Sequence, residues 1–205
     1  LKGLSELARK AAANEELPHQ HLDNSTLPFQ INPYQSGEPY EAVKQFVTGG
    51  MDHAALLKKM EVSVLRGMGG AGFPTFRKWS AVKGAPGNVK YIVCNADEGD
   101  PGAYSDRYLL EEQPHKVLLG MILTGYIIGA NWGVLYIRGE YPESVGIIID
   151  SIAFLRENHL IGDAILGSQF NFDFKVIKAM GAYICGEETA LLSSIEGQRP
   201  EVRVR

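Results

Sequence analysis

Three short apolar runs, separated by longer helical segments, constrain the fold of this 205-residue chain more than any other feature. The runs are KYIVCNA (90–96), GVLYIRGE (133–140) and FDFKVIKA (172–179). Their length and their β-branched and aromatic residues are typical of buried strands. Because strands alternate with helices, we predict an α/β fold with a parallel or mixed sheet covered on both faces by helices.

Helices are predicted from hydrophobic spacing, capping residues and glycine stops. Pro39 and Pro74 lie near predicted helix starts, and Asp52 is a candidate N-cap. We expect a helical and extended arm over residues 1–60 and one αβ domain over residues 61–205. The predicted helices are residues 4–16, 39–50, 52–63, 74–84, 107–113, 115–130, 142–158 and 186–197.

Composition excludes several classes of protein. The chain is 45% hydrophobic with a formal net charge of −4, which is ordinary for a globular protein and does not favour nucleic acid as a partner. The longest apolar run (121–137) is broken by polar residues and glycines, so it predicts a buried helix leading into a strand and no membrane insertion. Cys94 and Cys185 are too few for a disulfide framework or a metal cluster, and we expect a reducing, cytoplasmic setting.

A glycine-rich loop, RGMGGAGFPT (66–75), precedes one predicted helix. Successive backbone N–H groups in such a loop can surround an anion, and the helix N-terminus adds partial positive charge. Arg66 and Lys78 bring full charges to its two sides. The spacing matches neither a Walker loop nor the GxGxxG fingerprint. A cradle for a phosphate-bearing cofactor and a tight surface loop therefore both remain open.

Two polar loops follow predicted strands, where ligands of open α/β sheets bind. The first, NADEGDPGAYSDR (95–107), crowds three carboxylates together and suits either a polar ligand or a solvated acidic loop. The second, GAYICGEETALL (181–192), places Glu187 and Glu188 at a helix start, which is itself a sufficient structural role. Tyr183 can stack on a ring or pack, and Cys185 has no histidine close in sequence to activate it.

Four stretches together resemble one family, the FMN-bearing flavoprotein (diaphorase) subunit of complex I NADH dehydrogenases, NAD-reducing hydrogenases and NAD-dependent formate dehydrogenases. The resemblance runs in order from about Val64 to Arg199. It is carried by RGMGGAGFPTFRKW, YIVCNADEGDPGAYSDR, LYIRGEYPES and GAYICGEETALLSSIEGQRP.

The resemblance implies a Rossmann-like domain that holds FMN, with NADH stacking on the flavin. It implies no catalytic side chain, because hydride passes between the two cofactors; Glu98 and Glu188 are the nearest candidates. It implies no metal site in this chain. Phe73, Asp100 and Glu188 fall on positions that contact NADH. Cofactor contacts are implied for Gly67, Met68 (where the family commonly has Arg), Gly70, Lys78, Asn95, Asp97, Glu98, Tyr183, Gly186, Glu187 and Glu188.

The same resemblance implies a diaphorase that passes electrons to the iron–sulfur clusters of a larger complex. Its expected partners are an iron–sulfur subunit of the 24 kDa thioredoxin-like type and further electron-transfer subunits, in the cytoplasm or peripheral on a membrane complex. In the family the chain continues into further domains and carries a [4Fe–4S] cluster, which this chain is not expected to ligate. We therefore expect a fragment or truncated product.

Two alternatives remain within the resemblance. One is a truncated, non-catalytic assembly module that does not hold FMN alone. The other is a related membrane electron-transport subunit, whose acidic loop typically contains a Cys-Glu pattern that NADEGDPG lacks.

Overall fold

A computed structural model describes residues 39–50, 52–179 and 183–203. Its centre is a sheet of three parallel strands in the order β1-β2-β3. These are β1 (Tyr91–Ala96), β2 (Trp132–Arg138) and β3 (Asp173–Ala179). All three apolar runs are therefore strands, and the predicted α/β fold is confirmed.

The helices of the described residues agree closely with the sequence pattern. The predicted helix 4–16 and most of the predicted arm lie outside the described residues. The apolar run 121–137 forms the second half of one helix and then β2, and no described helix is long and apolar enough to cross a membrane. The elements are α2 (Pro39–Thr48), α3 (His53–Val62), α4 (Thr75–Gly84), α5 (Ser105–Glu112), α6 (Pro114–Ile128), α7 (Pro142–Glu157), α8 (Glu188–Ile195) and the 3-10 turns η2 (Ile165–Gly167) and η3 (Tyr183–Gly186).

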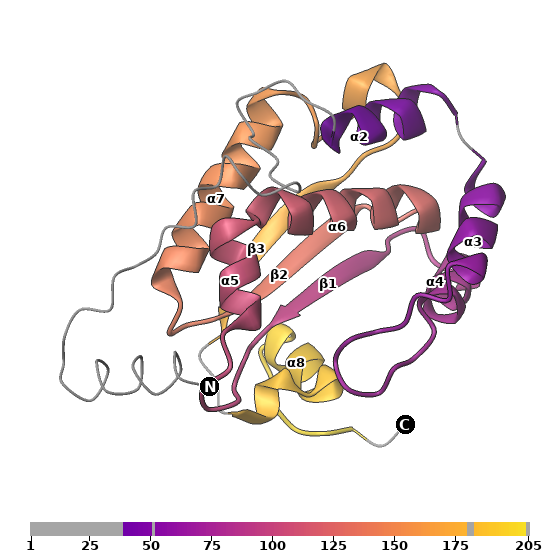
Figure 1. Cartoon of the computed structure of the whole chain (residues 1–205). Coiled ribbons are helices and arrows are strands. Elements are labelled where there is room, and N and C mark those ends of the chain that lie inside the picture. Colours follow the sequence, from indigo (N-terminus) through magenta and orange to yellow (C-terminus); the bar gives the residue numbers. More distant parts are fainter. Residues whose placement is uncertain (1–38, 51, 180–182, 204–205) are drawn as a thin grey trace, which may run out of the picture. The chain divides into compact units, whose positions relative to one another are not determined.

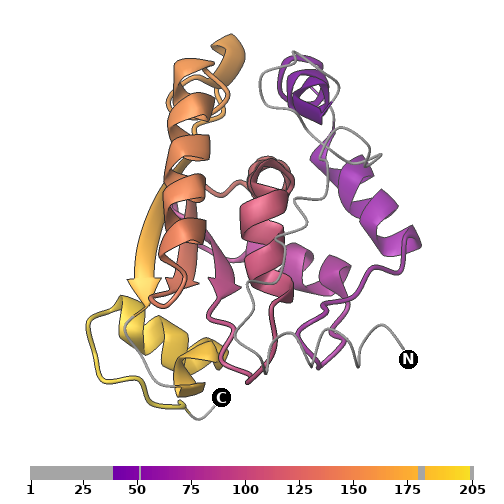
Figure 2. The same cartoon turned by 60° about the vertical axis from the view of Figure 1, so that its left-hand side comes forward.

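Helices α6 and α7 cover one face of the sheet, and α8 lies near the carboxyl ends of the strands (Figures 1 and 2). On the opposite face, Tyr136 packs with Leu191 of α8 and is 1% exposed. At the amino end of that face, Tyr91 and Trp132 are paired neighbours and are 58% and 41% exposed. We expected helices to cover both faces of the sheet. Among the described elements, this second face is covered only near the carboxyl ends of the strands, by α8.

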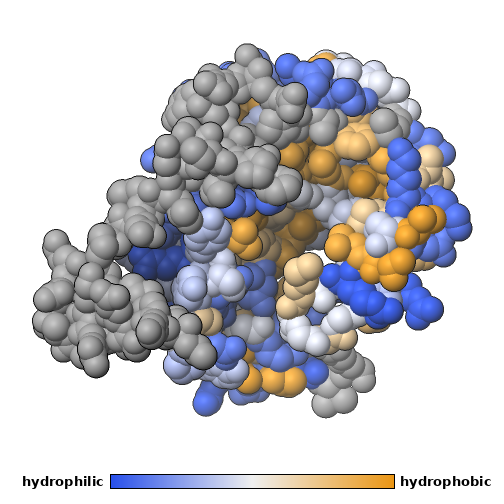
Figure 3. All heavy atoms as spheres, viewed as in Figure 1, coloured by the Kyte–Doolittle hydropathy of each residue, from blue (hydrophilic) through white to orange (hydrophobic). Residues whose placement is uncertain are grey.

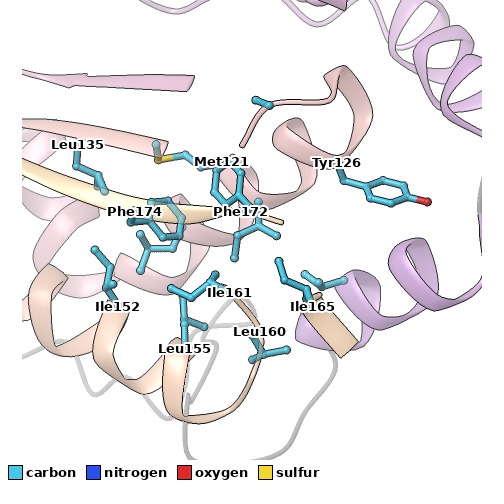
Figure 4. Close-up of a cluster of buried hydrophobic side chains, with 14 of the residues drawn as sticks. Met121, Tyr126, Leu135, Ile152, Leu155, Leu160, Ile161, Ile165, Phe172 and Phe174 are labelled. Carbon is cyan, nitrogen blue, oxygen red and sulfur yellow. The ribbon is translucent and has the colours of Figure 1, made fainter. Parts of the chain in front are cut away.

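The main core lies between the sheet, α6 and α7 (Figure 4). Phe172 is 1% exposed and packs edge-on against Phe174, with ring centroids 5.1 Å apart. Two glycines make room for these rings. A Cβ atom on Gly125 would lie 2.6 Å from Phe172, and one on Gly133 would lie 2.6 Å from Phe174.

Helices α2 and α3 belong to this core as well, through the buried side chains of Val43 and Leu56. Tyr40 of α2 also hydrogen-bonds across to His115 of α6, with 2.5 Å between the hydroxyl and Nδ1. Both helices lie mainly in the segment predicted as an arm. The division of the chain at residue 60 stays a prediction.

Candidate functional site

The acidic loop (95–107) and the second polar loop, around Tyr183–Gly186, meet beyond the carboxyl end of β1. The Asn95 amide Nδ2 donates to the carbonyl oxygen of Gly186 over 2.8 Å. A Cβ atom on Gly186 would lie 3.2 Å from the Asp97 carbonyl oxygen. The Tyr183 ring occupies the space where a side chain at position 99 would lie, and the nearby Asp100 carboxylate raises the pKa of the Tyr183 hydroxyl. Parallel pairing of the three strands thus brings two distant polar loops together, as the sequence predicted.

Asp97 presents an acceptor at this junction. Its Oδ2 atom is buried and has no hydrogen-bond partner in the described part of the chain. Burial raises the pKa of Asp97, Arg138 opposes this shift, and Glu140 adds to it, so that the pKa lies above its ordinary value. A buried, unpaired carboxylate oxygen is costly, and a ligand donor reaching it would remove that cost.

The neighbouring carboxylate, Glu98, has hydrogen-bond partners for both of its oxygens. It is 9% exposed and accepts from the Ser105 hydroxyl at 2.9 Å and from the backbone N–H groups of Asp106 and Arg107 at 3.2 and 3.4 Å. The Tyr141 hydroxyl donates to it as well, at 3.3 Å. Burial raises the pKa of Glu98, but these hydrogen bonds outweigh it and hold the pKa below its usual value.

Glu98 therefore serves as the N-terminal cap of α5, although it lies seven residues before Ser105. The cap also explains why α5 begins two residues earlier than the predicted helix at Arg107. Its two oxygens, with about four lone-pair sites, face four donors from within the chain.

Glu187 and Glu188 lie at the start of α8. Glu187 is the N-cap, and its carboxylate accepts from the backbone N–H groups of Thr189 and Ala190 at 2.8 and 2.9 Å. Glu188 is the first residue of the helix. Cys185, just before them, is fully buried against Tyr136 and Leu191, which keeps its thiol away from any substrate.

The glycine-rich loop lies between α3 and α4 and is held by its own backbone. The Gly67 N–H donates to the Phe73 carbonyl at 2.9 Å, and the Arg66 guanidinium donates to the Gly72 carbonyl at 3.1 Å. Gly70 and Gly72 adopt left-handed conformations, with φ of 101° and 60°, that L side chains rarely enter. Arg66, predicted to flank an anion, therefore also braces the loop.

The side chains of this loop point largely to solvent. Met68 is 93% exposed and Phe73 49% exposed, while Lys78 is exposed in the first turn of α4. Val62 and Val64, which precede the loop, are also exposed, at 71% and 68%. Figure 3 shows hydrophobic surface on the side of the molecule where α3 lies in Figure 1.

Val64 carries strain at the entrance to this loop. It is a β-branched residue, 68% exposed, with φ of 55° directly after the C-cap of α3. Val64→Gly is expected to raise the free energy of unfolding by about 1 kcal/mol, because glycine adopts this conformation without steric cost. Urea denaturation would measure the difference. The matched control is Val62→Gly in the last turn of α3, which should lower stability by a similar amount; a loss in both variants would contradict the strain at Val64.

Arg138 and Tyr141 are site residues that the sequence reasoning missed. Arg138 ends β2, beside β1 in the sheet, and its guanidinium donates to the Glu98 carbonyl oxygen over 2.5 Å. The Arg107 and Arg138 guanidinium carbons lie 5.7 and 5.8 Å from the centroid of the Tyr141 ring. The sequence could have indicated Arg138, because an arginine at the carboxyl end of a central strand lies at the same edge of the sheet as the acidic loop.

Comparison with known proteins gives this geometry a context. A family model described as the Nuo51 FMN-binding domain matches residues 60–205. The chain is 42% identical over 192 residues to a subunit of an NADH-quinone oxidoreductase of Rhizobium meliloti. It is 45% identical over 174 residues to the HndC subunit of the NADP-reducing hydrogenase of Solidesulfovibrio fructosivorans. A chain in the crystal structure of an air-oxidized NAD+-reducing [NiFe]-hydrogenase superimposes with a TM-score of 0.68 at 36% identity.

The chain spans less than half the length of these proteins. The alignments cover 94%, 85% and 82% of this chain, but only 44%, 35% and 28% of the respective relatives.

Proposed function

The chain belongs to the family of Nuo51 FMN-binding domains, and on that premise we propose that it binds FMN and NADH at the carboxyl end of its sheet. In this proposal it is the diaphorase module of a larger oxidoreductase complex. The observation that carries the proposal is the buried Oδ2 of Asp97, which has no hydrogen-bond partner among the described residues and lies beside the Asn95–Gly186 contact.

The residues present fit a flavin nucleotide. The Asp97 oxygen suits a ring N–H donor, and Gly186 lets the two loops approach closely at this point, because a Cβ atom there would lie only 3.2 Å from the Asp97 carbonyl oxygen. The left-handed Gly70 and the exposed Lys78 suit the phosphate. FMN, when bound, supplies the chemistry: it accepts hydride from nicotinamide and releases electrons singly.

The chain's own residues orient the cofactors and need not exchange protons. Glu98 is saturated by donors from within the chain, so we assign it no proton transfer, and we keep Glu188 as the nearest candidate. Phe73, 49% exposed, is proposed to stack on the NADH base, and Tyr183 and Asp100 to line the nicotinamide side.

The acidic character of the loop at 97–100 disfavours the additional 2′-phosphate of NADPH, so we propose a preference for NADH over NADPH. One relative carries the name of an NADP-reducing hydrogenase, so both nucleotides belong in the test. We expect electron-transfer subunits as partners, including an iron–sulfur subunit of the 24 kDa type, no iron–sulfur cluster ligated by this chain, and a place in the cytoplasm or on the surface of a membrane complex.

The proposal is tested by a visible absorption spectrum of the chain with FMN under anaerobic conditions, before and after NADH or NADPH. A bound-flavin spectrum that bleaches with NADH supports the diaphorase. FMN that stays free and oxidised would favour the alternative, a non-catalytic module that needs the rest of a longer protein to hold flavin.

Asp97→Ala is expected to weaken FMN binding at least about tenfold, because the ring N–H would lose a charged, desolvated acceptor. Titration of flavin fluorescence would measure the dissociation constant. The matched control is Asp163→Ala, which removes an exposed carboxylate from the loop before β3 and should leave the constant unchanged. Equal affinity of both variants would remove Asp97 from the site.

A further inference from the structure

Two residues at the end of β2 and in the turn before α7 hydrogen-bond to the acidic loop. Arg138 holds the backbone of the loop through its hydrogen bond to the Glu98 carbonyl oxygen. Tyr141 holds the side chain of the same residue through its hydroxyl. Glu98 directly follows Asp97 in the chain, so any shift at Glu98 moves the Asp97 carboxylate.

These contacts belong to a connected polar network. Arg107 of α5 pairs with Glu111 at 3.0 Å, and Glu111 accepts from the fully buried Ser144 hydroxyl of α7 at 2.7 Å. Arg138 pairs in turn with Glu140 at 3.1 Å. The Tyr141 ring lies within reach of both arginines, which fixes the ring and hence its hydroxyl. The loop is thus braced from α5, α7 and β2 together.

We propose that Tyr141 and Arg138 are positioning residues: acting through the Glu98 cap, they orient the loop that presents the Asp97 carboxylate to its ligand. In this proposal Glu98 contributes to the site by fixing the position of Asp97, and the Glu98 carboxylate itself contacts no ligand. The ligand part of this assignment rests on the proposed FMN site. The loop-holding part concerns the ligand-free chain alone.

The test compares Tyr141→Phe with the unsubstituted chain. This variant keeps the ring between the arginines and removes only the hydroxyl. In the ligand-free protein, backbone amide hydrogen exchange at Asp106 and Arg107 is expected to speed up several-fold, because the capping carboxylate loses its fourth donor. FMN affinity is expected to fall about fivefold to tenfold. Tyr91→Phe, at the exposed amino end of β1, is the matched control and should change neither quantity.

Glu98→Gln is the second variant, because an amide nitrogen cannot accept from the capping donors. It should accelerate exchange at Asp106 and Arg107 more than Tyr141→Phe does. Exchange unchanged in both variants would overturn the proposal. Faster exchange with unchanged FMN affinity would also overturn it, since the loop would not position the ligand. If the unsubstituted chain fails to bind FMN, the proposed function fails, and the exchange rates alone decide whether the network holds the loop.

Discussion

Replacing Phe172 with alanine is expected to lower the free energy of unfolding by about 4 kcal/mol. The ring is 1% exposed, lies centrally in the cluster of Figure 4, and stacks on Phe170 with 5.9 Å between centroids. Truncation removes the apolar transfer energy and leaves a cavity between the sheet and α6, because the surrounding helices relax only in part. Urea denaturation at neutral pH would measure the loss.

The control for Phe172 is Phe73→Ala, the same chemical change at a ring that is 49% exposed, which should cost about 0.5 kcal/mol or less. A second test uses Gly125→Ala, whose new Cβ would lie 2.6 Å from the Phe172 ring. It should destabilise the natural chain by about 1–3 kcal/mol but cost little in the Phe172→Ala background, where the ring is gone. Additive losses would contradict this packing.

Acid is expected to destabilise the chain through His115 by about 3 kcal/mol between pH 7 and pH 4. Burial lowers the pKa of His115 from 6.5 to about 4. Below pH 6.5 the unfolded chain therefore takes up a proton that the folded chain does not, so the stability from neutral His115 is complete above pH 6.5 and is lost as the pH falls toward 4. The residue is 5% exposed, between Tyr40 and Phe154, where water cannot solvate a charged ring.

Carboxylates also change stability in this pH range, so the His115 contribution is isolated by a variant. Tyr40→Phe combined with His115→Leu removes the titrating ring without leaving the tyrosine hydroxyl unpaired. Urea unfolding of this variant should show a much flatter pH dependence between 6.5 and 4. The matched control, His159→Asn, replaces an exposed histidine in a left-handed conformation and should keep the natural slope. Identical slopes in all three proteins would exclude His115 as the acid-sensitive group.

Much of the fold was determined by local sequence. The three apolar runs are the three strands, and Asp52 caps α3 through a 3.0 Å hydrogen bond to the Ala54 N–H. The predicted loops fall beyond the carboxyl end of β1 and after β3 because parallel pairing sends strand ends to one edge. These features depend on hydrophobic periodicity, capping chemistry and chain direction, which can be recognised from a short stretch of sequence.

The roles of individual carboxylates could not be determined in this way. Asp97 and Glu98 are adjacent and chemically alike. Within the part of the chain that the structure describes, Asp97 keeps an oxygen without a hydrogen-bond partner, whereas Glu98 accepts from Ser105, two backbone amides and Tyr141. The difference arises from donors that are distant in sequence, since Tyr141 comes from the turn after β2. Sequence alone thus predicted the fold class and the polar loops at the strand ends. Only the tertiary structure decided which acid keeps an oxygen without a partner in the described residues and which one caps α5, because burial and hydrogen-bond partners depend on contacts across the sheet.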